Sequence, residues 1–311
     1  MAHPSTRKSH SGIRSQRSIL RPGHDPAVRQ QSLSLVRATM QKAGFDLEQF
    51  NELKRRNDAA MREALVKSKA AADGRAPAMS ETVAKSTENW LKANGIGDAL
   101  APGTQVYPLS TADSISVDPA FELVFQNIAP WANSAQVILD KRADDHDLFD
   151  IRVTFTFSWV NQTGQTNLFT VYALVGVAAT CIVRADGYWW PLSPDPPFSR
   201  LEGLASLWIS QTVNGQVTVP PGESGQAQNT MDVAAHGAFT EGTIAEQDLF
   251  RTYILEYDGL LVPANATVEF NLNCEVDWEA REGGVQFFAA GNGRQVTAPG
   301  VIIATQPWII Q

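Results

Sequence analysis

The residues best suited to direct chemistry in this 311-residue sequence are the clustered acids of "ADDHDLFD", positions 143–150. Carboxylate oxygens at such close spacing are the hard ligands that Ca²⁺ prefers, although the calcium-loop pattern with a central glycine and a terminal glutamate is missing. The candidate ligands are Asp144, Asp145, Asp147 and Asp150. The alternative is a solvated acidic turn that precedes a strand beginning at Ile151.

A second candidate site is aromatic and lies in "GYWWPLSPDPP", residues 187–197. Tyr188, Trp189 and Trp190 precede a proline-rich stretch, and proline cannot donate a hydrogen bond to a strand ladder. We therefore expect a loop or a sheet edge, where indole rings can stack on a sugar or a base. The same side chains could instead cap the end of a sheet or fill an interface between subunits, and the sequence leaves these interpretations open.

No motif of a known catalytic centre accompanies these clusters. The sequence contains no HExxH, no GxSxG, no phosphate-cradling GxxxxGK[ST] and no CxxC. Three of the five histidines, at positions 3, 10 and 24, fall in the N-terminal region. Glu269 and Glu275 lie on the polar phase of one strand, but nothing pairs them with an acid at catalytic separation. We expect a protein that is not an enzyme and requires no cofactor.

Charge is distributed unevenly along the chain, whose formal net charge is −8. Residues 101–311 hold eight basic residues and twenty-three acids, a net charge of −15. Residues 1–31 hold six basic residues against one acid, a net charge of +5. This segment is poor in apolar residues and cannot offset the entropy cost of ordering, so we expect a mobile basic arm. Its basic residues are Arg7, Lys8, Arg14, Arg17, Arg21 and Arg29.

Four interpretations of the arm remain open on the sequence alone. Its cations could contact nucleic-acid phosphates, which gives salt-sensitive affinity. An Arg- and Ser-rich start that is poor in acids is also typical of an organelle transit peptide. The arm could dock on the acidic body of a neighbouring copy, or it could be an inert solvated tail.

The elements that position these groups change character along the chain. Residues 32–72 are rich in helix formers and contain no proline, which predicts helices interrupted near Gly44. A further short helix is expected over residues 80–94. The helices of this connector, residues 32–100, are too charged to form a core alone, so we expect them to pack on the β domain or on another copy.

From about residue 101 the apolar pattern alternates. "IRVTFTFSW" and "VEFNLNCEVDW" give five and six consecutive matches to period two, which predicts half-buried strands from Ile151 and from Val268. Turn signals, including "NQTGQTN", "VNGQ", "VPPGESG", "REGG" and "GNGR", separate them from less regular strands. Those strands are expected at 121–126, 135–140, 168–183, 205–213, 215–219, 250–258, 285–289 and 301–304. We expect residues 101–311 to form an antiparallel, jelly-roll-like β-sandwich, which makes the protein mainly β.

The longest apolar run, "VYALVGVAATCIV" (171–183), has 13 residues and is too short to cross a bilayer as a helix. It predicts a strand buried on both faces, or two strands joined by a bend near Gly176. Cys181 and Cys274 could pair, but Cys274 falls on the apolar phase of its strand and is expected to be a buried apolar side chain. The sequons at Asn161 and Asn265 have little meaning without a secretory signal, and we see no signal peptide.

The order of parts, a basic arm (1–31), a helical connector (32–100) and one β-sandwich (101–311), resembles the layout of coat proteins of small icosahedral viruses. The resemblance covers the whole chain in layout only, and no residue motif carries it. It implies a self-assembling protein of a virion or host cytoplasm, with arginines of the arm on packaged nucleic acid and Ca²⁺ at an acidic subunit contact such as 144–150. The alternative is a carbohydrate- or cell-surface-binding sandwich that uses Trp189 and Trp190.

Overall fold

The structure is a computed structural model that describes residues 104–188, 196–223, 227–238 and 241–307, together with Glu52, Arg56 and Lys67. The chain separates into two compact units, Met1–Arg55 and Arg56–Gln311. Glu52, Arg56 and Lys67 are helical, as expected for residues 32–72. All six basic residues of the arm lie outside the described residues.

The described residues form eleven strands and two short 3₁₀ helices. The strands are β1 (Gln105–Leu109), β2 (Ser114–Asp118), β3 (Phe125–Ala129), β4 (Ser134–Val160), β5 (Asn167–Ala185), β6 (Phe198–Val213), β7 (Gln216–Glu223), β8 (Gln228–His236), β9 (Thr243–Val262), β10 (Thr267–Ala289) and β11 (Gln295–Pro307). The 3₁₀ helices are η1 (Ala120–Glu122) and η2 (Pro130–Ala132).

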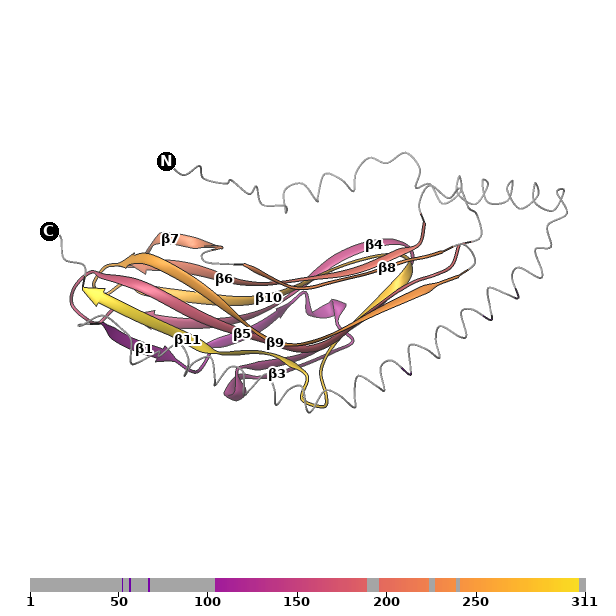
Figure 1. The fold of residues 1–311 in the computed structure, drawn as a ribbon. Coiled ribbons are helices and arrows are strands. Elements are labelled where there is room, and N and C mark those ends of the chain that lie inside the picture. Colours follow the sequence, from indigo (N-terminus) through magenta and orange to yellow (C-terminus); the bar gives the residue numbers. More distant parts are fainter. Residues whose placement is uncertain are drawn as a thin grey trace, which may run out of the picture. The chain divides into compact units, whose positions relative to one another are not determined.

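Eight of these strands pair as two four-stranded antiparallel sheets, which are joined where β10 pairs with β5 and where β11 pairs with β4. The two sheets pack face to face (Figure 1). One sheet has the order β1-β11-β5-β9, and the other has the order β4-β10-β6-β8. Numbered in chain order, the eight strands read 1-8-3-6 and 2-7-4-5, which is the strand order of a jelly roll, a sandwich built from two Greek keys. The predicted antiparallel, jelly-roll-like sandwich is therefore confirmed. β2 and β3 add to β4, and β7 adds to β6.

The core is made by the inward side chains of both sheets. In the second sheet Phe155 of β4 lies opposite Leu272 of β10, as the two alternating segments predict. Val171 and Val175 of β5, in the first sheet, belong to the same core cluster, and all four side chains are fully buried. Both cysteines are buried and free, which confirms the expectation for Cys274.

One strand passes from one sheet to the other at a bulge. β10 pairs with β4 along most of its length, but its second neighbour changes from β6 to β5 where the register shifts between Arg281 and Gly283. A Cβ atom on Gly283 would collide with the Arg184 carbonyl oxygen and the Ser199 hydroxyl, so only glycine lets β5 approach here. The turn predicted at "REGG" is wrong, because the segment is a bulge inside a strand that changes sheets.

Several predicted boundaries differ from the structure. The strand predicted at 121–126 is replaced by η1 followed by β3. The strands predicted at 135–140 and from Ile151 are one strand, β4, so the alternative of an acidic turn at 143–150 is wrong. "VPPGESG" was predicted as a turn, but β7 continues through its prolines at a sheet edge, where a missing amide hydrogen is tolerated. β1, β2 and β8 were not predicted.

β5 confirms one interpretation of the long apolar run. It is a single strand through Gly176, and its residues from Ala173 to Ala185 are buried on both faces. Within the part of the chain that the structure describes, no helix is long and apolar enough to cross a bilayer.

Candidate functional site

The base of the aromatic loop is described, but Trp189 and Trp190 lie outside the described residues. The half-buried Tyr188 donates its backbone N–H to the Ala238 carbonyl (3.2 Å), and Gly237 donates its own to the Pro197 carbonyl (2.8 Å). The two ends of the loop are thus bound to consecutive residues that follow β8. The sequence showed a proline-rich break, but it could not show that both ends return to one place.

A buried ion pair lies at the end of β5, directly before Tyr188. The Arg184 guanidinium and the Asp186 carboxylate are 2.8 Å apart, and both side chains are only one-tenth exposed. Arg142 approaches the other Asp186 oxygen at 3.4 Å, and the Asp186 backbone N–H donates to the Glu282 carbonyl (2.9 Å). Removing one partner would leave an uncompensated buried charge, which typically costs about 3–5 kcal/mol.

The predicted acidic site does not bring its described carboxylates together. Asp147 and Asp150 are three residues apart in β4, and residues an odd number apart in a strand project from opposite faces. The Asp147 carboxylate accepts the Leu148 backbone N–H (3.0 Å). The side chains of Asp144 and Asp145 lie outside the described residues. Among the side chains that are described, no group of three or more His, Cys, Asp or Glu is placed to hold a metal ion.

The structure instead assembles a row of acids that the sequence did not reveal. On the outer face of the β4-β10-β6-β8 sheet, hereafter the polar face, the strand registers place one carboxylate of each strand side by side. These four residues, the acid row, are Asp150, Asp277, Glu202 and Asp232. Like charges placed directly opposite across strands repel one another, so the row favours a neighbouring cation.

Arg200 supplies positive charge at one end of the acid row. Its guanidinium lies 2.6 Å from the Glu202 carboxylate and binds both oxygens of Asp232, at 3.0 and 2.9 Å. The hydrogen bond from Arg200 holds the pKa of Asp232 below its usual value. His146, in the middle of β4, lies 2.8 Å from Glu279 of β10.

The centre of the polar face holds a cation between an acid and an aromatic ring. Arg152 Nε lies 3.0 Å from Glu275, and its guanidinium lies 4.7 Å from the centre of the Trp208 ring. Burial raises the pKa of Glu275, and the charge of Arg152 partly offsets that rise. Thr154 and Thr156 continue the face with hydrogen bonds across to β10. The polar side chains at the centre of this face therefore bind one another through an ion pair, a cation–π contact and hydrogen bonds.

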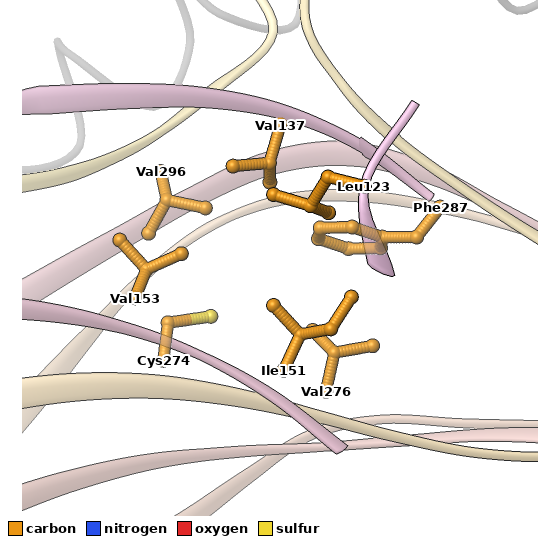
Figure 2. Close-up of a pocket in the computed structure, with 8 residues that line it drawn as sticks. All are labelled: Leu123, Val137, Ile151, Val153, Cys274, Val276, Phe287 and Val296. Atoms are coloured by element: carbon orange, nitrogen blue, oxygen red, sulfur yellow. The ribbon is translucent and has the colours of Figure 1, made fainter. Parts of the chain in front are cut away.

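The described residues also surround a gap in the core, between β4, β10 and β11. Figure 2 shows its lining side chains, which are apolar and include Leu123, Phe287 and Cys274. Its interior has no room for a water molecule, so it is a packing feature.

Comparisons with known proteins do not assign the chain to a family. No family model matches the sequence, and no curated protein matches it. Among solved structures, a carbohydrate-binding module described by its recognition of mannan has 8% sequence identity and a TM-score of 0.20, over 60% of this chain and 96% of the module. The Gx and Gt strains of infectious bursal disease virus have 11% and 12% identity, with TM-scores of 0.15 and 0.14. The matches cover 54% and 56% of this chain but only 37% and 38% of the virus chains. TM-scores this low carry no argument about function.

Proposed function

We propose that this chain is a structural protein that self-assembles into a coat, with its basic arm on nucleic acid. The observation that carries the proposal is the partition of charge, +5 in residues 1–31 and −15 in residues 101–311. Nucleic acid attracts the arm by releasing counterions and repels the acidic sandwich. The two parts of the chain therefore have different partners, as a coat requires of an inner arm and an outer shell. The protein would then be located in a virion or in the host cytoplasm.

The arm has one competing partner among the described residues, the acid row of a neighbouring copy. Both partners are anionic, so charge alone does not separate them. They differ in their response to nuclease, because only contact with nucleic acid is lost when the nucleic acid is digested.

Size-exclusion chromatography with light scattering on the full-length protein tests the proposal. We expect particles far larger than the 33.9-kDa chain, with excess absorbance at 260 nm over 280 nm. A monomer or small oligomer without nucleic acid would contradict it. Particles that contain no nucleic acid would support self-assembly but contradict the proposed contact between the arm and nucleic acid.

The arm is tested separately by changing its six basic residues to alanine or, as the matched control, its five arginines to lysine. Six phosphate contacts on a single strand give a salt slope of about −4, so affinity should fall roughly 300-fold between 50 and 200 mM salt. The lysine variant should keep this slope, and the alanine variant should lose binding. An alanine variant with wild-type affinity would show that other residues contact the nucleic acid.

A second function, binding of carbohydrate or cell-surface glycans through Trp189 and Trp190, is favoured by the anchored base of their loop. A loop whose two ends are fixed at Gly237 and Ala238 loses less entropy on binding than a loop with free ends. We expect the double change Trp189→Ala with Trp190→Ala to abolish binding on a glycan array. The matched control is Trp131→Ala, which removes a tryptophan that is 88% exposed elsewhere. Equal binding by both variants, or no binding by the wild type, would exclude this function.

A further inference from the structure

The outer face of the β1-β11-β5-β9 sheet carries apolar side chains where water would be expected. Thr180 interrupts them, and its hydroxyl donates a hydrogen bond to the Asp248 carboxylate. Odd-numbered residues of β5 point into the core, so the even-numbered ones point outward. Leu174 and Ile182 nevertheless are only 2% and 1% exposed. Their neighbours on β9 extend the apolar surface, because Ile254 lies opposite Leu174 and Phe250 lies opposite Ala178. We call these five apolar residues the apolar face.

The other sheet shows what a solvated outer face looks like in this protein. The outward residues of β10 are polar or charged throughout, from Glu269 to Arg281. In an antiparallel sheet with one face in solvent, polar residues occupy the outward positions of each strand. A strand buried on both faces carries apolar residues at nearly all positions instead. We therefore expect another part of a protein to cover the apolar face and keep it from water.

The cover must come from outside the strands around β5. The described neighbours of β5 are β9, β10 and β11 beside it, and β6 and β8 across the core. Residues Arg56–Gln311 form one compact unit, in which the first strand begins at Gln105. This unit thus includes the stretch 57–103, which we call the pre-strand segment.

The length and end point of the pre-strand segment fit the apolar face. It ends directly before β1, which pairs with β11, the neighbour of β5. From Leu174 to Ile182 the strand advances about 26 Å, which a helix of about 18 residues matches. The segment has 47 residues and carries apolar side chains such as Leu65, Val83 and Leu91.

We propose that the pre-strand segment docks on the apolar face of its own chain. This assigns one partner to the connector, for which the sequence left both the β domain and another copy open. The inference does not depend on the proposed coat function.

Limited trypsin digestion of the full-length protein tests the inference, with peptides identified by mass spectrometry. The pre-strand segment has six tryptic cleavage sites. The arm has five, because Pro22 follows Arg21 and blocks cleavage there, and these five serve as the internal reference. We expect the segment to be cut at least tenfold more slowly than the arm. Phe250→Glu, which places a charge on the apolar face, should remove this protection. The matched control is Leu148→Glu, at a 43% exposed position on the polar face, and should leave cleavage unchanged.

Three outcomes would overturn the inference. The first is equal cleavage of segment and arm in the wild type, a result that needs no variant to fold. The second is unchanged protection in a Phe250→Glu protein whose near-ultraviolet circular dichroism is native. The third is protection that disappears on dilution, which would assign the apolar face to a second copy.

Discussion

Replacement of Asn161 by aspartate is expected to destabilise the sandwich strongly, because this side chain joins two turns. It is fully buried, and its Nδ2 lies within 3.0 Å of the carbonyl oxygens of Gln165, Val262 and Pro263. Its Oδ1 accepts the hydroxyl of Thr163 at 2.7 Å. One amide thus holds the β4–β5 turn against the end of β9.

The expected loss in the free energy of unfolding follows from the hydrogen bonds that aspartate cannot donate. It keeps the shape of asparagine and its acceptor oxygen, but as a carboxylate it donates no hydrogen bond and faces three carbonyl oxygens. Each buried acceptor left without its donor costs about 1–3 kcal/mol. We expect the free energy of unfolding at pH 7 to fall by about 4 kcal/mol. For a domain of this size that lowers the midpoint of thermal unfolding by roughly 8–16 °C.

The loss should also depend on pH. Burial against carbonyl oxygens raises the pKa of the introduced carboxyl in the folded state. Between its ordinary and its raised pKa the folded protein binds more protons than the unfolded protein, so stability falls as pH rises. The deficit of Asn161→Asp relative to wild type should therefore be smaller at pH 4.5 than at pH 7.

Urea unfolding followed by tryptophan fluorescence at both pH values measures this difference. The matched control is Gln162→Glu, the same amide-to-acid change at the exposed neighbouring residue, with an expected effect below about 0.5 kcal/mol. A loss below about 1 kcal/mol for Asn161→Asp, or a pH dependence equal to that of the control, would refute the reasoning.

Two further substitutions and one labelling experiment test other parts of the structure. Gly283→Ala should lower the free energy of unfolding by about 1–3 kcal/mol in urea, because its Cβ meets β5 at the bulge; a neutral result would mean that β5 can move away. Arg152→Ala should raise the pKa of Glu275 further in a carboxyl-carbon NMR titration, since the Arg152 charge now lowers it, and an unchanged pKa would argue against the pair. Burial raises the pKa of Cys274 to about 12 and raises that of Cys181 as well, so a maleimide at pH 8 should label neither thiol until urea unfolds the protein.

Sequence patterns predicted the strands in which apolar and polar residues alternate over many positions. In β10 the alternation of apolar and polar residues marks the core side directly, and the structure confirms each assignment from Val268 to Trp278. β8 was missed because its inward residues include Ala235, whose small side chain gives little contrast with its neighbours. The bulge at Gly283 has the composition of a turn, so only the pairing on both sides shows that the strand continues.

The acid row could not be predicted because it is a property of strand order. Alternation places Asp277 on the polar phase of β10, but it does not say which strands flank β10. The neighbours β4 and β6 come from distant parts of the chain, and the jelly-roll order brings Asp150 and Glu202 beside Asp277. The base of the aromatic loop has the same origin, since Tyr188 meets Ala238 only after β6 and β8 have paired.

The contrast between the two outer faces restricts where a coat could make its contacts. The polar face carries the acid row, so a polyanion would be repelled from it, and in a shell filled with nucleic acid this face would point away from the contents. If the apolar face is covered by the pre-strand segment, it is closed to other copies as well. Contacts between copies would then fall to the sheet edges and turns, where the described apolar side chains Val124, Phe125 and Trp131 are exposed. Assembly through these edges and docking of the pre-strand segment can therefore succeed or fail independently.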